Sequence, residues 1–205
     1  MANVPAEEWG ADQAIQMIPN DYLRYYWFAA EMIRKEEERE ERGLGTRAAE
    51  MLRIEQDLFA RYQEPSLTTL PEELSRRGGA YCSEVAVTAM VAIANDQNRL
   101  MVVNGLNGKT IADLPSDVVV DVTAKVNRKG ACSLYPGPLP LQVRGLIQQV
   151  KVYETLTIEA AVRINRDLAL AGLIANPLVH SAKVAEHLLH DILNANREDL
   201  PEGWT

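Results

Sequence analysis

The segment Arg76–Glu84 holds the residue types best suited to chemistry: two arginines, two adjacent glycines and a tyrosine, in the order Arg76-Arg77-Gly78-Gly79-Ala80-Tyr81. Glycine has no Cβ atom, so a ligand can approach this backbone closely, and arginine recognises anions. A free phenol has a pKa of about 10, so a tyrosine acts as a base only where a helix N-terminus, arginines or a metal favour the phenolate. Two roles for Tyr81 stay open: a catalytic base, and a packed residue at a helix cap, which composition alone favours.

Other familiar motifs are excluded. The segment Gly105–Thr110 is no nucleotide-triphosphate loop, because Val103 occupies the place of its first glycine. No GxGxxG motif follows a strand, so the chain holds no dinucleotide-binding unit, and no GxSxG motif occurs. The three histidines, His180, His187 and His190, lack acidic or cysteine partners in register, so we expect surface histidines and no metal ligands.

Helices must position most of these residues. Apolar spacing of three and four residues predicts a helix from Asn20-Asp21 into the charged stretch 34–42, a second from Thr46 to Pro65 and a short third one before Gly78. A fourth helix is expected from about Tyr81 to Asn95, so the glycine pair leads directly into a helix N-terminus.

The second half of the chain is expected to hold a small sheet followed by helices. Dense β-branched residues predict strands at 100–103 and 118–126, the latter in a hairpin that turns at Asn127–Gly130. One long helix is expected from Leu141 to about Ala175, then a last helix over 181–196 and a frayed tail over 201–205.

Composition indicates an ordinary globular protein of 205 residues, 47% of them apolar, which we expect to form a single domain over residues 1–205. A net charge of −8 argues against nucleic acid and anionic membranes as partners. The chain shows neither a secretion signal nor a membrane-length apolar run. Two cysteines, Cys82 and Cys132, without metal spacing indicate a reducing compartment and packing roles. We therefore expect a cytoplasmic protein that forms a homo-oligomer, because its helices carry more apolar surface than a small sheet can cover.

Several segments resemble the family-four glycosidases, the NAD- and divalent-metal-dependent 6-phospho-glucosidases and their relatives. Arg77–Glu84 resembles the family's RGGAYYSE segment, and Asn20–Tyr26 its xPYLRYYY helix start. Further similarities, in the same order, lie at Asp113–Val122, Tyr135–Pro140, Leu156–Ala161, Asn176–Val179 and Ile192–Arg197. Together the segments extend over about Asn20–Pro201, and their order makes them far more specific than any one alone.

The resemblance implies an α+β fold, predominantly helical with a small sheet, like the C-terminal domain of lactate and malate dehydrogenases. It implies hydrolysis of O-glycosidic bonds by an exception to the two-carboxylate scheme. NAD oxidises the sugar at C3, a base removes the proton at C2, the glycosidic bond is eliminated, water adds, and the ketone is reduced again. Tyr81 falls on the family's proton-abstracting base.

The resemblance also implies NAD and Mn as cofactors, but their binding groups belong to the family's N-terminal half, a Rossmann domain absent from this chain. Implied partners are that missing half and a glycoside or phosphoglycoside. We expect substrate contacts from Arg77, Asn104, Asn107 and Lys109. Leu106 stands where the phosphosugar members have a phosphate-binding arginine, so the substrate need not be phosphorylated.

Two functions remain as hypotheses. The first is the C-terminal domain of an NAD- and Mn-dependent, 6-phospho-β-glucosidase-like glycosidase, incomplete by itself. The alternative is a non-catalytic oligomerisation or regulatory module that keeps the fold without the cofactor site.

Overall fold

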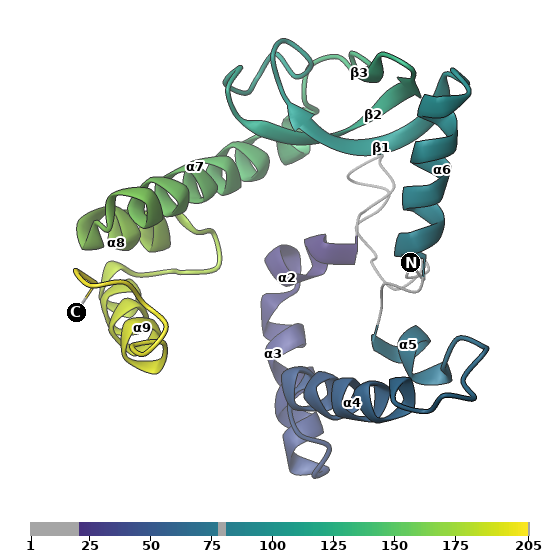
Figure 1. Ribbon diagram of the computed structural model, residues 1–205. Helices are drawn as coiled ribbons and strands as arrows, with labels where there is room; N and C mark the ends of the chain where they lie inside the picture. Colours follow the sequence, from purple (N-terminus) through teal and green to yellow (C-terminus); the bar gives the residue numbers. More distant parts are fainter. Residues whose placement is uncertain (1–20, 78–80, 205) are drawn as a thin grey trace. The chain divides into compact units, whose positions relative to one another are not determined.

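The computed structural model describes residues 21–77 and 81–204 and is predominantly helical with one small antiparallel sheet, as expected (Figure 1). The chain divides into two compact units. Of the described residues, the first unit comprises 21–26, 102–123 and 133–204, and the second comprises 27–77, 81–101 and 124–132. The single domain over residues 1–205 stays a prediction, and each unit is described by itself.

The sheet contains β1 (Arg99–Leu106), β2 (Val119–Asn127) and β3 (Gly130–Ser133) in the order β1-β2-β3. Every second residue of β2 is buried, namely Val120, Val122, Ala124 and Val126. This alternation is the period-two pattern that β-branched residues favour. The predicted hairpin at Asn127–Gly130 is confirmed, and Gly130 takes the positive φ of 96° that its turn requires.

The chain enters the described region through a 3-10 turn (Asp21–Leu23), α2 (Arg24–Trp27) and, after a break at Phe28, α3 (Ala29–Glu41). The single helix expected here is therefore interrupted, and its expected cap, Asn20, lies outside the described residues. The second unit continues with α4 (Arg47–Tyr62), α5 (Glu72–Arg77) and α6 (Cys82–Ala94). Thr46 caps α4 as predicted, since its side chain accepts a hydrogen bond from the backbone of Ala49 at 3.2 Å.

Partly exposed charge pairing joins α3 to α4. The Glu50 carboxylate accepts hydrogen bonds from Arg47 at 2.8 Å and from Arg39 at 2.9 Å. These two guanidinium groups, Arg47 foremost, lower the pKa of Glu50 below its ordinary value of 4.5, against the opposing effect of burial. One carboxylate thus ties the end of α3 to the start of α4.

The first unit holds α7 (Leu141–Arg163), α8 (Arg166–Ala175) and α9 (Ala182–Ala195). The prediction of one helix over 141–175 was wrong, because the chain turns at Ile164, whose φ is +50°. Asn165 then caps α8 by accepting a hydrogen bond from Leu168 at 2.9 Å. The turn allows α8 to fold back on α7, where Gly172 lies against Thr157.

Two apolar clusters form the core of the first unit. Val120 and Val122 of β2 pack with Ile111 and Leu114 of the preceding loop, and Val118, Leu139 and Ile147 surround them. The second cluster joins Ala160, Leu189, Leu193 and Trp204. Trp204 is only 9% exposed, so the expectation of a frayed tail was wrong. Burial of the large apolar indole is favourable, and its contacts hold the end of the chain against α7 and α9.

No helix among the described residues is both long and apolar enough to cross a membrane. Cys82 and Cys132 are free and exposed, which corrects the expectation that they are packing residues.

Candidate functional site

Tyr81 lies at the N-cap of α6, the helix start predicted for it. Its backbone carbonyl accepts the hydrogen bond from Val85 at 3.0 Å, while its side chain makes no cap hydrogen bond. The residue is 68% exposed, and no hydrogen bond of its phenol to another described residue is found. The phenol is therefore available to a ligand, and the packed-cap role that composition favoured does not describe this exposed ring.

From Val85 onward, the helix that follows Tyr81 is apolar except for Thr88. Only Ala92 of α6 is buried, and exposed apolar side chains surround it, including Val85, Val87, Met90, Val91 and Ile93. A helix that is apolar all round is normally enclosed by protein or membrane. Tyr81 thus stands at the head of a surface that water solvates poorly.

Arg77 ends α5 and contributes to a small cavity of about 180 Å³ against α4, which Glu55, Leu58, Phe59, Tyr62 and Leu74 also line. Its guanidinium lies 3.8 Å from the Glu55 carboxylate. Gly78 and Gly79, whose close backbone approach the sequence suggested, lie outside the described residues. Arg77 can recognise an anion by exchanging this long, half-exposed ion pair for a ligand.

Asn107 is the most tightly held residue of the predicted substrate loop. Only 1% exposed, its side-chain amide donates to the carbonyls of Ile111, Leu114 and Pro115 at 2.9, 3.0 and 2.9 Å. Its carbonyl oxygen accepts from the Ile111 backbone at 2.7 Å. Every polar atom of this side chain is thus used within the loop, so its burial speaks against the predicted direct contact with substrate and assigns it a structural role.

The remaining loop residues face solvent. Asn104 and Leu106 lie on the exposed face of β1, and Lys109 is exposed in the turn that follows. Backbone hydrogen bonds of 2.8 Å, from Asn107 to Val118 and from Gly108 to Ser116, fix the base of this turn. A ligand can therefore reach Asn104 and Leu106 on β1 and Lys109 in the turn.

Asp113 connects this loop to α7. Its carboxylate accepts a hydrogen bond from the Leu139 backbone at 2.7 Å and lies 3.3 Å from Arg144. Arg144 also donates to the Leu139 carbonyl at 2.9 Å. Sequence reasoning placed Asp113 in a family-like segment but assigned it no role, since its partners lie 26 and more residues further along the chain.

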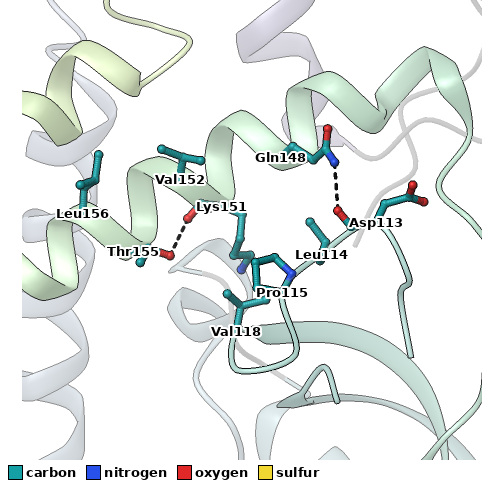
Figure 2. Close-up of a pocket in the computed structure, with 9 residues that line it drawn as sticks. All are labelled: Asp113, Leu114, Pro115, Val118, Gln148, Lys151, Val152, Thr155 and Leu156. Carbon is teal, nitrogen blue, oxygen red and sulfur yellow. Dashed lines mark hydrogen bonds between the residues drawn. The ribbon is translucent and has the colours of Figure 1, made fainter. Parts of the chain in front are cut away.

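A largely apolar groove of about 570 Å³ lies between the 113–118 loop and α7 (Figure 2). Leu114, Pro115, Val118, Val152 and Leu156 form its apolar walls. Its polar side chains already have partners: Gln148 donates to the Asp113 carbonyl at 2.9 Å, and Lys151 donates to the Val119 carbonyl at 2.8 Å. The groove therefore shows no unsatisfied polar group that identifies a ligand.

The predicted site residues fall into two groups. Arg77 and Tyr81 belong to the second unit, whereas Asn104, Asn107 and Lys109 belong to the first. Asn107 and Lys109 lie in the same loop and Asn104 lies on β1, which leads into it, whereas Arg77 ends α5 and Tyr81 precedes α6.

The residues present do not fit the cofactors that the resemblance implies. Among residues 21–77 and 81–204, no three His, Cys, Asp or Glu side chains are grouped as a metal site requires. His180, His187 and His190 are all exposed, and His190 lies 2.8 Å from the Asn194 amide. Nor does any described strand lead through a glycine-rich turn into a helix as a dinucleotide requires.

Comparison with known proteins agrees with the resemblance. Residues 7–179 match the profile of the "Family 4 glycosyl hydrolase C-terminal domain". A probable 6-phospho-beta-glucosidase of Bacillus subtilis is 38% identical over 204 residues, which are 98% of this chain and 46% of that protein. The 6-phospho-beta-glucosidase BglT of Thermotoga maritima is 34% identical over 206 residues, 99% of this chain and 48% of that protein. The chain thus spans about half the length of the curated relatives it matches.

Solved structures also match this chain over slightly less than half of their own length. The Thermotoga maritima 6-phospho-beta glucosidase with NAD and glucose-6-phosphate superposes with a TM-score of 0.82 at 33% identity, over 92% of this chain and 44% of that one. A second structure of that enzyme contains manganese, NAD+ and glucose-6-phosphate and gives a TM-score of 0.81 at 34% identity, over 95% of this chain and 46% of that one. The chain belongs to family 4 of the glycosyl hydrolases and corresponds to their C-terminal domain.

Proposed function

We propose that this chain is the substrate-side part of a glycosidase that cleaves glucosides or 6-phosphoglucosides, with NAD and a divalent metal held by a companion N-terminal half. One observation carries the proposal: the chain matches about half the length of 6-phospho-beta-glucosidases along nearly all of its own. The NAD and manganese of the solved Thermotoga maritima structures find no fitting residues in the described part of this chain, which supports the proposal that a companion holds them.

The exposed apolar surface of α6 also supports a companion half. Ala92 is the only buried residue of α6, and apolar side chains of this helix such as Val85, Met90 and Ile93 are exposed. The companion half supplies a surface that removes these side chains from water, each worth roughly 1.5–3 kcal/mol when fully buried. Tyr81, at the start of the same helix, then lies beside the cofactor-bearing half.

Tyr81 is the proposed base. Its phenolate oxygen accepts the proton from C2 of a sugar that has been oxidised at C3, and the electron pair of that C–H bond then drives departure of the group at C1. NAD and the metal, held by the companion half, supply the oxidation and the charge stabilisation. The exposure of the phenol at the N-cap of α6 supports this role, because a ligand can reach its oxygen.

Arg77, Asn104 and Lys109 are the proposed substrate contacts of this chain. All three have solvent-facing side chains, and the two cations can balance an anionic substituent on the sugar. Leu106 offers no hydrogen bond to a phosphate, so we propose that unphosphorylated glucosides are also accepted.

The test uses the full-length protein that contains this chain, or the chain co-expressed with the NAD-binding half of the Bacillus subtilis relative. Hydrolysis of aryl glucosides and of their 6-phosphates is measured with and without NAD and Mn, together with deuterium exchange at C2. Tyr81→Phe is expected to lower turnover and C2 exchange by a factor of about 10²–10⁴. Tyr135→Phe, a matched change at another exposed tyrosine, is expected to leave both unchanged.

Full activity of the Tyr81→Phe protein would remove Tyr81 from the mechanism and leave the glycosidase assignment standing. Absence of NAD-dependent turnover in the wild-type assembly would instead favour the non-catalytic module.

A further inference from the structure

A small cavity between α4 and α5 has a lining that combines apolar, aromatic and charged side chains. The residues that line it are Glu55, Leu58, Phe59, Tyr62, Leu74 and Arg77. Those on α4 are spaced i, i+3, i+4 and i+7, so they share one face of that helix. Those on α5 lie at i and i+3 and share a face likewise. Two helix faces of the second unit therefore form the cavity, which we call the α4–α5 cavity.

Two polar contacts hold α5 against α4. Arg61 donates a hydrogen bond to the Glu73 carboxylate at 3.3 Å, and Arg47 donates one to the Arg76 carbonyl at 3.1 Å. These residues do not line the cavity. A ligand can therefore enter it without breaking the contacts that keep the two helices together.

The exposure of the lining residues shows which of them a ligand meets first. Leu58 is only 4% exposed, whereas Phe59 and Tyr62 are 60% and 52% exposed. The buried leucine thus lies at the inner wall, and the two aromatic rings lie where the cavity meets solvent. Arg77 and Glu55, 3.8 Å apart, add a pair of opposite charges and no net charge. This lining suits an uncharged and largely apolar ligand.

The volume of about 180 Å³ suits a ligand of one ring. An apolar cavity of about 150 Å³ accepts benzene. Phe59 and Tyr62 offer ring faces and edges against which an aromatic ligand packs, and a guanidinium such as that of Arg77 stacks on aromatic rings. A sugar would lose the hydrogen bonds that its hydroxyl groups make with water, and the lining offers few polar side chains to replace them. The cavity therefore favours an aromatic ring over a second sugar.

Arg77 connects the α4–α5 cavity to the proposed base. Arg77 and Tyr81 are four positions apart in the sequence, so their α-carbons lie at most about 14 Å from each other. Both side chains are thus within reach of one aryl glucoside. Tyr81 would contact its sugar, and Arg77 would contact it where the sugar joins the ring.

We propose that the α4–α5 cavity binds the aromatic leaving group of a glucoside substrate. The assignment rests on the proposed glycosidase function and adds to it the place of the group at C1. Binding of the ring does not require the companion half, because every residue that lines the cavity belongs to this chain. For a ligand as small as phenol we expect a dissociation constant of about 1 mM.

The first test titrates the purified chain with phenol up to about 20 mM, well above that constant, and follows the backbone amide signals by NMR. Signals of α4 and α5 are expected to shift and to saturate. Phe59→Ala removes one aromatic wall and is expected to weaken phenol binding about three- to tenfold. Leu74→Trp fills the cavity and is expected to abolish phenol binding.

The matched control is Leu52→Ala, at a 62% exposed position of α4 outside the cavity, which should bind phenol as the wild type does. Circular dichroism confirms that each variant keeps its helices. The proposal is overturned if phenol shifts no signal of α4 or α5, or if Phe59→Ala and Leu74→Trp leave its binding unchanged. Loss of phenol binding on addition of the companion half would assign the cavity to that half and would also overturn the proposal.

The second test uses the assembled enzyme and compares a phenyl glucoside with the methyl glucoside of the same configuration. Phe59→Ala is expected to lower kcat/KM for the phenyl glucoside about three- to tenfold, mainly through KM. The methyl group is too small to fill the cavity, so kcat/KM for the methyl glucoside should stay within about twofold of the wild-type value. Leu52→Ala should change neither.

The two substrates separate the possible failures. An equal loss for both glucosides would mean a general structural effect, and it would overturn the assignment of the leaving group, as would an unchanged kcat/KM for the phenyl glucoside. A wild-type assembly that hydrolyses neither glucoside would overturn the proposed function itself, and the leaving-group assignment would fall with it.

Discussion

At the scale of residues, Asn107 shows how one side chain can replace regular secondary structure. The stretch 107–118 joins β1 to β2 without a helix or strand of its own, so its backbone groups have no ladder to join. The Asn107 amide supplies the missing partners for Ile111, Leu114 and Pro115. These hydrogen bonds matter more because they are buried: a buried polar group without a partner destabilises the fold by more than one hydrogen bond stabilises it.

Replacement of this side chain should therefore be costly. Asn107→Ala leaves the Ile111 N–H and three carbonyl groups without their partner, and we expect the free energy of unfolding to fall by about 2–4 kcal/mol. Urea unfolding followed by circular dichroism measures the change. Asn104→Ala, the same substitution at an exposed position of the preceding strand, should cost less than about 0.5 kcal/mol. Equal costs at the two sites would show that the buried bonds are not the reason.

At the scale of elements, the contacts between α3, α4 and α5 depend on carboxylates. Arg47 and Arg39 lower the pKa of Glu50. A hydrogen bond from its own backbone, followed by the charge of Arg61, lowers the pKa of Glu73 on α5. A group whose pKa falls on folding stabilises the native state above its unfolded value and loses that contribution as the pH falls through the native value.

Acid should consequently loosen these helices. The two carboxylates contribute their full stabilisation above pH 4.5, the ordinary pKa of glutamate. They lose it as the pH falls through their lowered pKa values in the folded protein. The difference in unfolding free energy between wild type and Glu50→Gln should be constant above this pH and should shrink as the pH falls further. Urea unfolding at a series of pH values measures it. Glu64→Gln, at an exposed glutamate of the second unit for which no ion pair with another described residue is found, is the matched control. If the difference in unfolding free energy between wild type and Glu50→Gln did not change with pH, the ion pairs of Glu50 would not be its source.

Local signals in the sequence predicted most elements, and tertiary contacts account for the exceptions. The strand β2, the Thr46 cap and the start of α6 at Tyr81 all depend on neighbouring residues, and all were predicted. The break at Ile164 was missed, although Asn165 followed by Asp167 in the first turn of α8 is a recognisable helix start. The apolar pattern runs through this point because α7 and α8 bury faces against each other.

The candidate site was predictable in part for a similar reason. Tyr81 and Arg77 stand in a short, distinctive segment, so their positions on α6 and α5 followed from it. The burial of Asn107 could not be predicted, because its partners and the cluster around Ile111 surround it only after the chain has folded. The exposure of Cys82 could not be predicted either. The helix α6 is mostly apolar in sequence, which suggests a buried helix, whereas its surface is exposed in the structure.

At the scale of the whole molecule, the apolar surface of α6 indicates how this chain joins a larger protein. If the companion half covers this helix, Met90→Lys should weaken its association with the chain at least tenfold, because a lysine amine cannot be buried without a partner. The lone chain should keep its thermal stability, since Met90 is 59% exposed. Co-purification and calorimetric titration of the two halves measure the effect.

The matched control is Val162→Lys, at a 79% exposed apolar position of α7. Unchanged binding of the Met90→Lys chain would show that the companion half contacts another surface.

Trp204, the penultimate residue, gives the first unit a built-in optical probe. Its indole is enclosed by side chains from α7 and α9, including Ala160, Leu189 and Leu193. Gly203, at a φ of +105° and with its α-carbon facing Ile164, turns the chain so that the ring enters this cluster. Loss of the cluster exposes the ring to water and shifts its fluorescence emission to longer wavelengths. Once the other two tryptophans, Trp9 and Trp27, are replaced by phenylalanine, opening of the α7–α9 helices can therefore be followed in real time without an added label.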